Sequence, residues 1–219
     1  MMQDYVELNE AQEISETDPF TSERYAQFFR YFPASTRTVL DVGCNVGRGG
    51  AVLKALNPDL QLVGLDCVAK RLNRISAEIY DRTICSYSTD INVDKDCFDV
   101  IVAGEFIEHL YEQDVTQTLK EFYRVLKSQG RLLMTTPNPD YIRLKLTGGS
   151  VLGGAHVSQH YPSVLKHLLE QIGFTNLQIQ GSGKVSRWLG DQFPILAVYG
   201  SYLVIADKPS SSRSEYSLA

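Results

Sequence analysis

Carboxylates and glycines at the ends of predicted strands are the residues of this chain whose types and spacing could do chemistry. Within residues 38–50, an apolar run reaches Asp41 and then meets Gly43 and Gly47. Glycine lets the backbone turn sharply and approach a ligand closely. The helix that follows such a turn offers free N–H groups to negative charge. The pattern therefore indicates a site for a nucleotide-like cofactor.

The spacing of the glycines distinguishes between cofactors. The dinucleotide fingerprint needs glycine at positions 43, 45 and 48, and this chain has Asn45 and Arg48 at the last two. An acid two residues before the first glycine suits a cofactor with an ammonium or sulfonium group better than a pyrophosphate. We expect S-adenosylmethionine, with an ordinary strand-to-helix turn as the alternative. Because asparagine tolerates positive φ, Asn45 should hold the loop shape that glycine would hold.

Two further acids follow predicted strands. Asp66 ends the apolar run that begins at Leu62, about 20 residues beyond Gly47. In dinucleotide folds an acid at about that distance accepts hydrogen bonds from ribose hydroxyls, and S-adenosylmethionine carries the same ribose. Asp90 follows a third run and is expected to accept the adenine amino group, with a solvated loop aspartate as the alternative.

Four segments together resemble the class I S-adenosylmethionine-dependent methyltransferases, and among them the small-molecule enzymes related to ubiquinone biosynthesis. The segments are residues 39–47, 64–66, 98–110 and 126–137, within a match over roughly residues 36–180. The Glu-x-x-Glu-His-Leu block at 105–110 is the most specific part. The resemblance implies an α/β fold, a Rossmann-like three-layer sandwich with a seven-stranded, mostly parallel sheet and an antiparallel last strand.

The chain departs from the family pattern at two places. Asn45 replaces the middle glycine of the loop, and Ser128-Gln129-Gly130 replaces the usual Pro-Gly-Gly turn. Gly130 is expected to supply the left-handed residue that a helix C-terminus needs. No Asn-Pro-Pro-Tyr-like segment follows the fourth strand, unlike the resembling enzymes that methylate base or glutamine nitrogens.

The cofactor-binding residues are expected at strand ends and in the loops after them, because ligands of open α/β sheets lie outside the carboxyl ends of the strands. They are Asp41, Gly43, Cys44, Asn45, Gly47, Asp66, Cys67, Asp90, Ile91, Gly104 and Glu105. The product would be S-adenosylhomocysteine. The four cysteines lie singly, without a Cys-x-x-Cys pair or a histidine at ligand-like spacing, so they are expected to be reduced and no metal site is predicted.

A histidine is the expected base. Methyl transfer is a direct displacement, in which alignment of the reacting atoms supplies much of the rate. A base is needed only for an acceptor proton of high pKa, and a neutral histidine suits that role near pH 7. One of His109, His156 and His160 is expected to act, with a structural role at the helix start or in loop packing as the alternative.

Alternating strands and helices must position these residues, and the alternation is typical of a parallel α/β fold. Strands are expected near residues 38–43, 61–66, 82–88, 98–104, 131–136, 175–180 and 197–206, and helices near 47–57, 68–80, 113–127 and 161–172. Aromatic residues at helical spacing in 21–32 indicate another helix, whose stripe favours core packing over a substrate lid.

One domain is expected over residues 1–208, with a helical extension over 1–35 and a flexible tail over 209–219. Residues 138–160 and 181–194 are long segments between elements. Loops of more than about 12 to 15 residues in a compact domain tend to be functional lids or disordered, and the glycine, aromatic and basic residues of these two favour lids.

Composition limits the function classes. A chain of 219 residues with 43% hydrophobic residues can bury a sizeable core, and a net charge of −5 argues against nucleic-acid partners. The acidic N-terminus does not resemble a secretory signal, and the longest apolar stretch, 193–206, is too short and too interrupted to span a membrane. We expect a cytoplasmic monomer or homodimer.

The leading hypothesis is methyl transfer from S-adenosylmethionine to a small-molecule acceptor, with a hydroxyl oxygen favoured. Two alternatives remain open. One is a catalytically silent S-adenosylmethionine-binding partner of another enzyme, which the replacements at Asn45 and 128–130 favour weakly. The other is an NAD-linked oxidoreductase, which shares the ribose-binding acid but lacks the glycine fingerprint.

Overall fold

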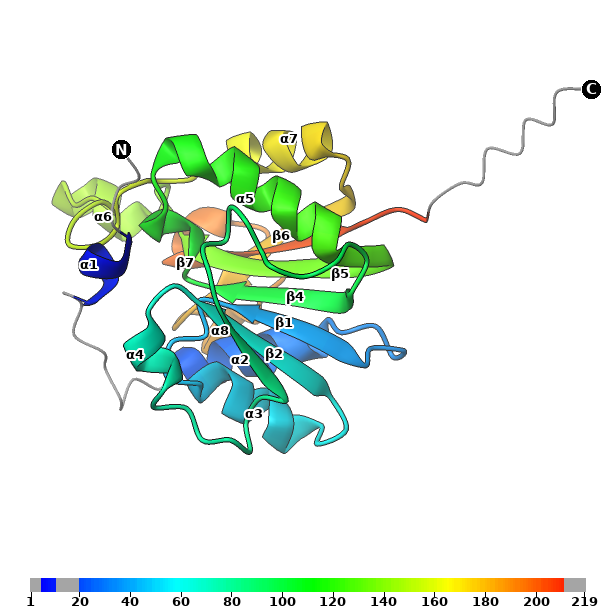
Figure 1. The fold of residues 1–219 in the computed structure, drawn as a ribbon. Coiled ribbons are helices and arrows are strands. Elements are labelled where there is room, and N and C mark those ends of the chain that lie inside the picture. The colour runs from blue at the N-terminus through cyan, green and yellow to red at the C-terminus, as the bar shows by residue number, and fades with distance from the viewer. Residues whose placement is uncertain (1–4, 11–19, 211–219) are drawn as a thin grey trace, which may run out of the picture.

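The computed structural model describes residues 5–10 and 20–210, shown in colour in Figure 1. The helical extension expected over residues 1–35 therefore falls partly outside the described residues. The tail expected over 209–219 lies outside them except for residues 209 and 210.

A seven-stranded sheet forms the centre of the molecule. Its strands are β1 (Thr38–Val42), β2 (Gln61–Asp66), β3 (Arg82–Cys85), β4 (Phe98–Gly104), β5 (Leu126–Pro137), β6 (Thr175–Ser182) and β7 (Ser201–Asp207). The spatial order is β3-β2-β1-β4-β5-β7-β6. The pairs from β3 to β5 are parallel, and β7 runs antiparallel to both β5 and β6. The predicted mostly parallel sheet with an antiparallel last strand is confirmed.

Helices cover both faces of the sheet, which gives the three layers (Figure 1). Helices α2 (Phe20–Arg30) and α3 (Arg48–Leu56) pack on one face, where Phe28 and Leu53 are fully buried. On the other face, α5 (Glu112–Val125) and α7 (Pro162–Ile172) bury apolar side chains such as Leu119. Because both faces are covered, the central strands are apolar along most of their length.

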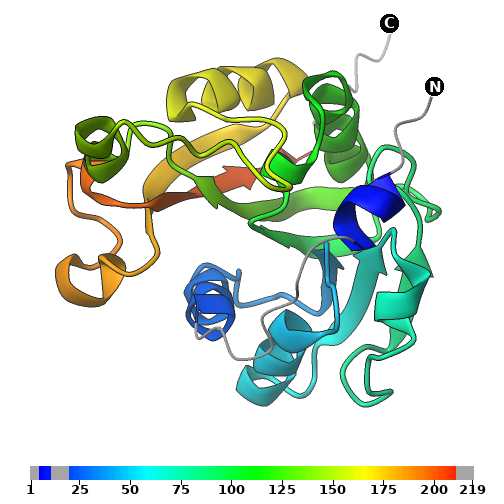
Figure 2. The ribbon, with the colours of Figure 1, turned by 90° about the vertical axis from the view of Figure 1, so that its left-hand side faces the viewer.

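Shorter elements lie around the carboxyl ends of the parallel strands, the side that faces the viewer in Figure 2. They are α1 (Tyr5–Glu10), α4 (Ala69–Leu72), the 3-10 turn η1 (Ile107–His109), α6 (Ile142–Thr147), α8 (Ser186–Leu189) and the 3-10 turn η2 (Leu196–Val198). The strand order reverses between β1 and β4, because β2 and β3 continue to one side and β5 to the other. Such a switch point is where open α/β sheets bind ligands.

The structure corrects the predicted helix at 68–80 and the predicted strand end at 88. Helix α4 stops at Leu72, and the following residues form turns that bring the buried Tyr80 inward. Strand β3 stops at Cys85, because Ser88 turns inward and hydrogen-bonds Thr118 at 2.9 Å. Tertiary contacts thus override the local pattern in both segments.

The prediction for Gly130 is wrong. Helix α5 ends at Val125 and leads directly into β5, and Gln129, with φ +66°, is the left-handed residue. A Cβ atom at Gly130 would lie 2.8 Å from the carbonyl oxygen of Lys127, so the backbone approaches too closely here for any side chain.

The last strand starts at Ser201 and not at the predicted residue 197, because Leu196–Val198 form the turn η2. Among the described residues, no helix is long and apolar enough to cross a membrane.

Candidate active site

A cavity of about 310 Å³ opens at the carboxyl ends of β1, β2 and β4. Its volume falls at the lower end of the range for small-molecule sites. The loops after the first four strands line most of it, and α1 and α2 close one side with Tyr5, Asn9, Thr21, Arg24 and Tyr25. The cavity therefore lies at the switch point of the sheet.

The loop after β1 has the left-handed backbone that its glycines predict. Residues Gly43, Asn45 and Gly47 have φ values of +70°, +54° and +85°. The expectation that Asn45 holds this conformation is confirmed. A Cβ atom at Gly43 would lie 2.7 Å from the ring of Phe106, so the loop also needs glycine there for close packing. The loop and Phe106 together form the floor of the cavity.

Asp66 lies at the end of β2 and lines the cavity. Its carboxylate accepts backbone N–H hydrogen bonds from Asn45 and Val68, each at 2.9 Å. An ionised carboxylate offers about four lone-pair sites, so it can still accept bonds from two ribose hydroxyls. Asp66 thus ties the two loops together and keeps acceptor capacity toward the cavity.

Asp41 is fully buried and does not line the cavity. The hydroxyls of Tyr25 and Tyr80 donate to its two carboxylate oxygens, each at 2.5 Å. Burial raises the pKa of Asp41 to about 7; the two tyrosine hydrogen bonds act against that rise, and the charge of Asp66 adds to it. Asp41 acts on the cavity through Tyr25, whose side chain lines it.

The structure does not bring Asp90 and Ile91 to the cavity. Both line a separate, open hollow beside β3, and the N–H of Ile91 donates to Glu121 at 3.0 Å. Ser88 and Thr89 line the cavity at the place where Asp90 was expected. Of the other expected residues, Gly47 stands behind the lining at the start of α3, and Cys44, Cys67 and Gly104 line it.

Two polar acceptors at the cavity have no hydrogen-bond partner within the described part of the chain. They are Oδ1 of Asn45 and Oε1 of Glu105, both buried. The nearest cation to the latter is Nε of Arg24 at 3.8 Å, and the second carboxylate oxygen of Glu105 accepts from Ser201 at 3.3 Å. An unpaired buried acceptor costs about 1–3 kcal/mol. A ligand that carries a cationic donor, such as an ammonium group, fits this pair.

Only one of the three expected histidines lines the cavity. Burial lowers the pKa of His109 to about 4, so its ring is neutral near pH 7. The ring of His156 lies against it, with centroids 4.9 Å apart. His160 is outside the lining, where its Nε2 lies 2.9 Å from the hydroxyl of Ser158, and burial lowers its pKa as well.

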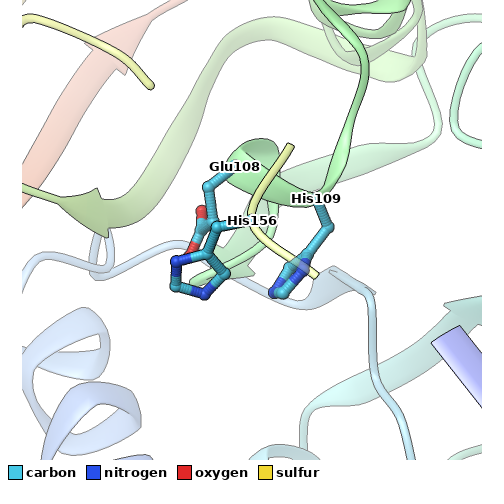
Figure 3. A group of neighbouring side chains, drawn as sticks. All are labelled: Glu108, His109 and His156. Atoms are coloured by element: carbon cyan, nitrogen blue, oxygen red, sulfur yellow. The ribbon is translucent and has the colours of Figure 1, made fainter. Parts of the chain in front are cut away.

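Glu108 lies beside His156 and is 1% exposed (Figure 3). One carboxylate oxygen accepts from the hydroxyl of Thr136 at 3.0 Å, and Oε1 has no partner among the described residues. Burial, together with the charge of Glu105, holds the pKa of Glu108 well above its usual range. A cation beside Glu108 would stabilise its charged form and would provide a partner for Oε1.

Sequence reasoning missed the part of the cavity that α1 and α2 supply. Tyr5 and Asn9 carry no motif, whereas Tyr25 belongs to the aromatic stripe in 21–32. That stripe does pack in the core as predicted, with Phe28 fully buried and Tyr25 5% exposed. The inclusion of a polar tyrosine in an otherwise phenylalanine stripe was the only signal of a second role.

Known proteins share this sequence pattern and fold. A sequence profile for the family described as "Methyltransferase domain" matches residues 16–179. The rat mitochondrial ubiquinone biosynthesis O-methyltransferase is 27% identical over 165 residues, 68% of this chain and 47% of that protein. A probable S-adenosylmethionine-dependent methyltransferase of Mycolicibacterium smegmatis is 29% identical over 63% of this chain and 52% of its own. The chain spans about half the length of these curated relatives.

Solved structures agree on the fold. A methyltransferase from Archaeoglobus fulgidus described as S-adenosylmethionine-dependent superposes with a TM-score of 0.65 at 19% identity, over 85% of this chain and 92% of that one. Phosphoethanolamine N-methyltransferase 2 of Haemonchus contortus, in complex with S-adenosylmethionine, gives a TM-score of 0.64 at 14% identity, over 86% of this chain and 52% of that one. These likenesses concern the arrangement of helices and strands.

The chain belongs to the methyltransferase-domain family, since the profile covers most of its length. The resemblance to class I methyltransferases is thereby confirmed, and so is the expectation of S-adenosylmethionine as the cofactor. The residues that line the cavity also fit this cofactor chemically. Asp66 offers acceptors for the ribose hydroxyls, and the unpartnered oxygens of Asn45 and Glu105 suit an ammonium group.

Proposed function

We propose that this protein transfers the methyl group of S-adenosylmethionine to a hydroxyl oxygen of a small-molecule acceptor. The observation that supports the proposal is the cavity at the switch point, whose lining combines the carboxylate of Asp66, two buried oxygens without a hydrogen-bond partner and the ring of His109. When bound, the cofactor supplies an activated methyl group on a positively charged sulfur. The protein's own task is therefore to bind it, exclude water and align the acceptor.

Asp66, Asn45 and Glu105 are proposed to hold the cofactor. Asp66 accepts the ribose hydroxyls, and the oxygens of Asn45 and Glu105 accept from the ammonium group of the methionine part. Arg24 and Tyr25 from α2 line the cavity and are proposed to limit the entry of water. Ser88 and Thr89, rather than Asp90, are proposed to face the adenine.

Oxygen is the favoured acceptor atom because several of the curated relatives are named for it. The rat relative is named an O-methyltransferase of ubiquinone biosynthesis, and a Laribacter hongkongensis relative, 27% identical over 59% of this chain and 46% of its own, a malonyl-[acyl-carrier protein] O-methyltransferase. A hydroxyl must give up its proton before or during transfer. His109, which lines the cavity with the ring of His156 against it, is the proposed base, and its pKa of about 4 makes it a weak one at pH 7.

The two insertions are proposed to cover the acceptor. Residues 138–160 contain α6, and residues 181–194 contain α8, which rests on α2 through the ion pair of Arg187 with Glu23. Each insertion presents a strongly exposed apolar side chain: Leu146 is 81% exposed and Trp188 87%. Such side chains suit contact with an apolar acceptor.

The acidic net charge disfavours nucleic acid as a partner, so none is proposed. A cytoplasmic monomer or homodimer remains the prediction.

Calorimetric titration with S-adenosylmethionine tests the first half of the proposal, with NADH as the comparison ligand. The second half needs a panel of catechols, phenols and sugar alcohols, with S-adenosylhomocysteine and the methylated product measured by mass spectrometry. We expect saturable cofactor binding and O-methylated product. No binding at millimolar cofactor would reject the proposal. Binding without turnover on any acceptor would favour a silent binding protein, and product methylated only on nitrogen would reject the oxygen assignment.

A further inference from the structure

Glu108, His109 and His156 form a compact cluster at the edge of the cavity. The first two belong to η1, and the third comes from the loop between α6 and α7. One potential ligand atom from each lies within 4.8 Å of those of the others, and Figure 3 shows the three side chains next to one another. Residues far apart in the sequence therefore meet at one place beside the cavity.

In both histidines, Nδ1 lies within hydrogen-bond distance of a backbone carbonyl oxygen. Nδ1 of His109 lies 3.0 Å from the carbonyl oxygen of Ala155, and Nδ1 of His156 lies 2.9 Å from that of Val151. Because a carbonyl oxygen can only accept, Nδ1 of His156 carries the ring proton and its lone pair resides on Nε2. The ring of His109 is oriented by the carbonyl oxygen of Ala155 and also by the backbone of Glu105. Metal-binding histidines show this arrangement, in which a backbone carbonyl fixes the tautomer and the orientation of the ring.

The carboxylate of Glu108 is held in the same way. The hydroxyl of Thr136 donates to Oε2, while Oε1 is buried and has no hydrogen-bond partner within the described ranges. Burying a carboxylate oxygen without a partner is costly unless the charge is paired or binds a metal. This unpartnered oxygen is independent of the histidine geometry, and it points to a cation.

We propose that Glu108, His109 and His156 bind one divalent transition-metal ion of the zinc type. Two imidazoles and one carboxylate suit Zn²⁺ and the similar Co²⁺, whereas Mg²⁺ and Ca²⁺ prefer oxygen ligands alone. Bonds of 2.0–2.2 Å place tetrahedral ligand atoms roughly 3.3 Å apart, so the cluster closes by up to about 1.5 Å on binding. His156 follows Gly153 and Gly154, whose positive φ and open surroundings allow that adjustment.

Three protein ligands leave one coordination position open, as catalytic zinc sites do. Because His109 also lines the cavity, the open position lies at its edge and can take the acceptor oxygen. This role rests on the proposed O-methyl transfer, whereas the metal site itself does not. A bound cation lowers the pKa of a coordinated hydroxyl, which releases its proton to water. The oxygen then forms its bond to the methyl carbon as the methyl–sulfur bond breaks, and the electron pair stays on sulfur.

The prediction of no metal site rested on ligand spacing along the chain. The loop histidine joins the other two ligands only through the fold. The site would also fasten the insertion over residues 138–160 to the cavity, since the backbone of that insertion already contacts the ring of His109 and donates to the carbonyl of Glu108 through Val157 at 2.9 Å.

Metal titration of the full chain tests the site. The protein is stripped with a chelator and titrated with Zn²⁺ and with Co²⁺ by calorimetry, and the visible absorption of the Co²⁺ form reports its coordination. We expect one ion per chain. Glu108→Gln and His156→Ala should each weaken binding by at least about 100-fold. His167→Ala, which changes an exposed histidine on α7, should bind like the wild type.

The outcomes separate this proposal from the proposed function. Thermal unfolding of wild type and of His156→Ala, both in chelator, shows that the variant is folded, so that a loss of metal binding reports on the ligand. The absence of saturable binding, or equal affinity in wild type and His156→Ala, would overturn the metal site even if methyl transfer is observed. Turnover that is lost in chelator, and restored by Zn²⁺ in wild type but not in His156→Ala, supports the acceptor role. Turnover unaffected by chelator overturns that role alone.

Discussion

The hydroxyl of Tyr25 lies 2.5 Å from a carboxylate oxygen of Asp41 in the interior of the protein. Tyr25 belongs to α2, and Asp41 belongs to β1, which leads into the glycine loop. The contact depends on Gly49, because a Cβ atom there would lie 2.0 Å from the tyrosine ring. The hydrogen bond therefore holds α2 against β1 beside the cavity.

Removal of that hydroxyl should destabilise the fold. Tyr25→Phe leaves one oxygen of the buried Asp41 without its donor, so the free energy of unfolding should fall by about 1–3 kcal/mol. Denaturant unfolding measures the change. The matched control is Tyr161→Phe, at a tyrosine that is 41% exposed, which should leave the midpoint unchanged. Equal midpoints for the two variants would contradict the stabilising role of the contact.

The raised pKa of Asp41 makes stability depend on pH. Its pKa is about 7 in the folded chain and 3.8 for the free group, so the folded state keeps a proton that the unfolded state loses between these values. The free energy of unfolding should therefore fall as pH rises through this window, by roughly 2–3 kcal/mol from pH 5 to 7.5 through this group.

Asp41→Asn is the variant that isolates this effect, because asparagine does not titrate and all other groups are shared. Unfolding free energies are measured at pH 5 and at pH 7.5 for both proteins. The wild type should lose more stability between the two values than the variant does. Parallel pH profiles would show that Asp41 keeps an ordinary pKa in the folded state.

The hydrogen bonds that Asp66 is proposed to accept should contribute to the affinity for S-adenosylmethionine. Asp66→Ala removes the proposed acceptors for the ribose hydroxyls, so affinity for S-adenosylmethionine should fall by about 1–3 kcal/mol, measured by calorimetry. The control is Asp59→Ala, at an exposed aspartate in the turn before β2. An unchanged affinity in Asp66→Ala would mean that the ribose lies elsewhere.

The sheet and the glycine loop could be predicted because their signals are local. Strands buried on both faces are continuous apolar runs, and Gly43, Asn45 and Gly47 are among the residues that tolerate the backbone of the loop. The seven-stranded order with its antiparallel strand came instead from the family resemblance. Neither prediction required knowledge of individual side-chain contacts between distant segments of this chain.

The parts that failed depend on such contacts. The helix predicted over 68–80 is shorter because Tyr80 turns inward and hydrogen-bonds Asp41. Asp90 does not line the cavity, because the N–H of the neighbouring Ile91 is bonded to Glu121 elsewhere. No local pattern records these pairings. The same holds for the meeting of His109 and His156, which only the folded loop creates.

Asn45 offers a test of whether its backbone or its side chain matters more. Its φ of +54° is open to glycine and strained for a β-branched residue by about 1–3 kcal/mol. Asn45→Gly should therefore keep the loop and lose only the acceptor Oδ1, whereas Asn45→Val should lose both. Calorimetry should give a moderate loss of S-adenosylmethionine affinity in the first variant and a larger one in the second. Wild-type affinity in Asn45→Gly would remove Oδ1 from the cofactor site, and equal losses in the two would show that the left-handed backbone contributes nothing to binding.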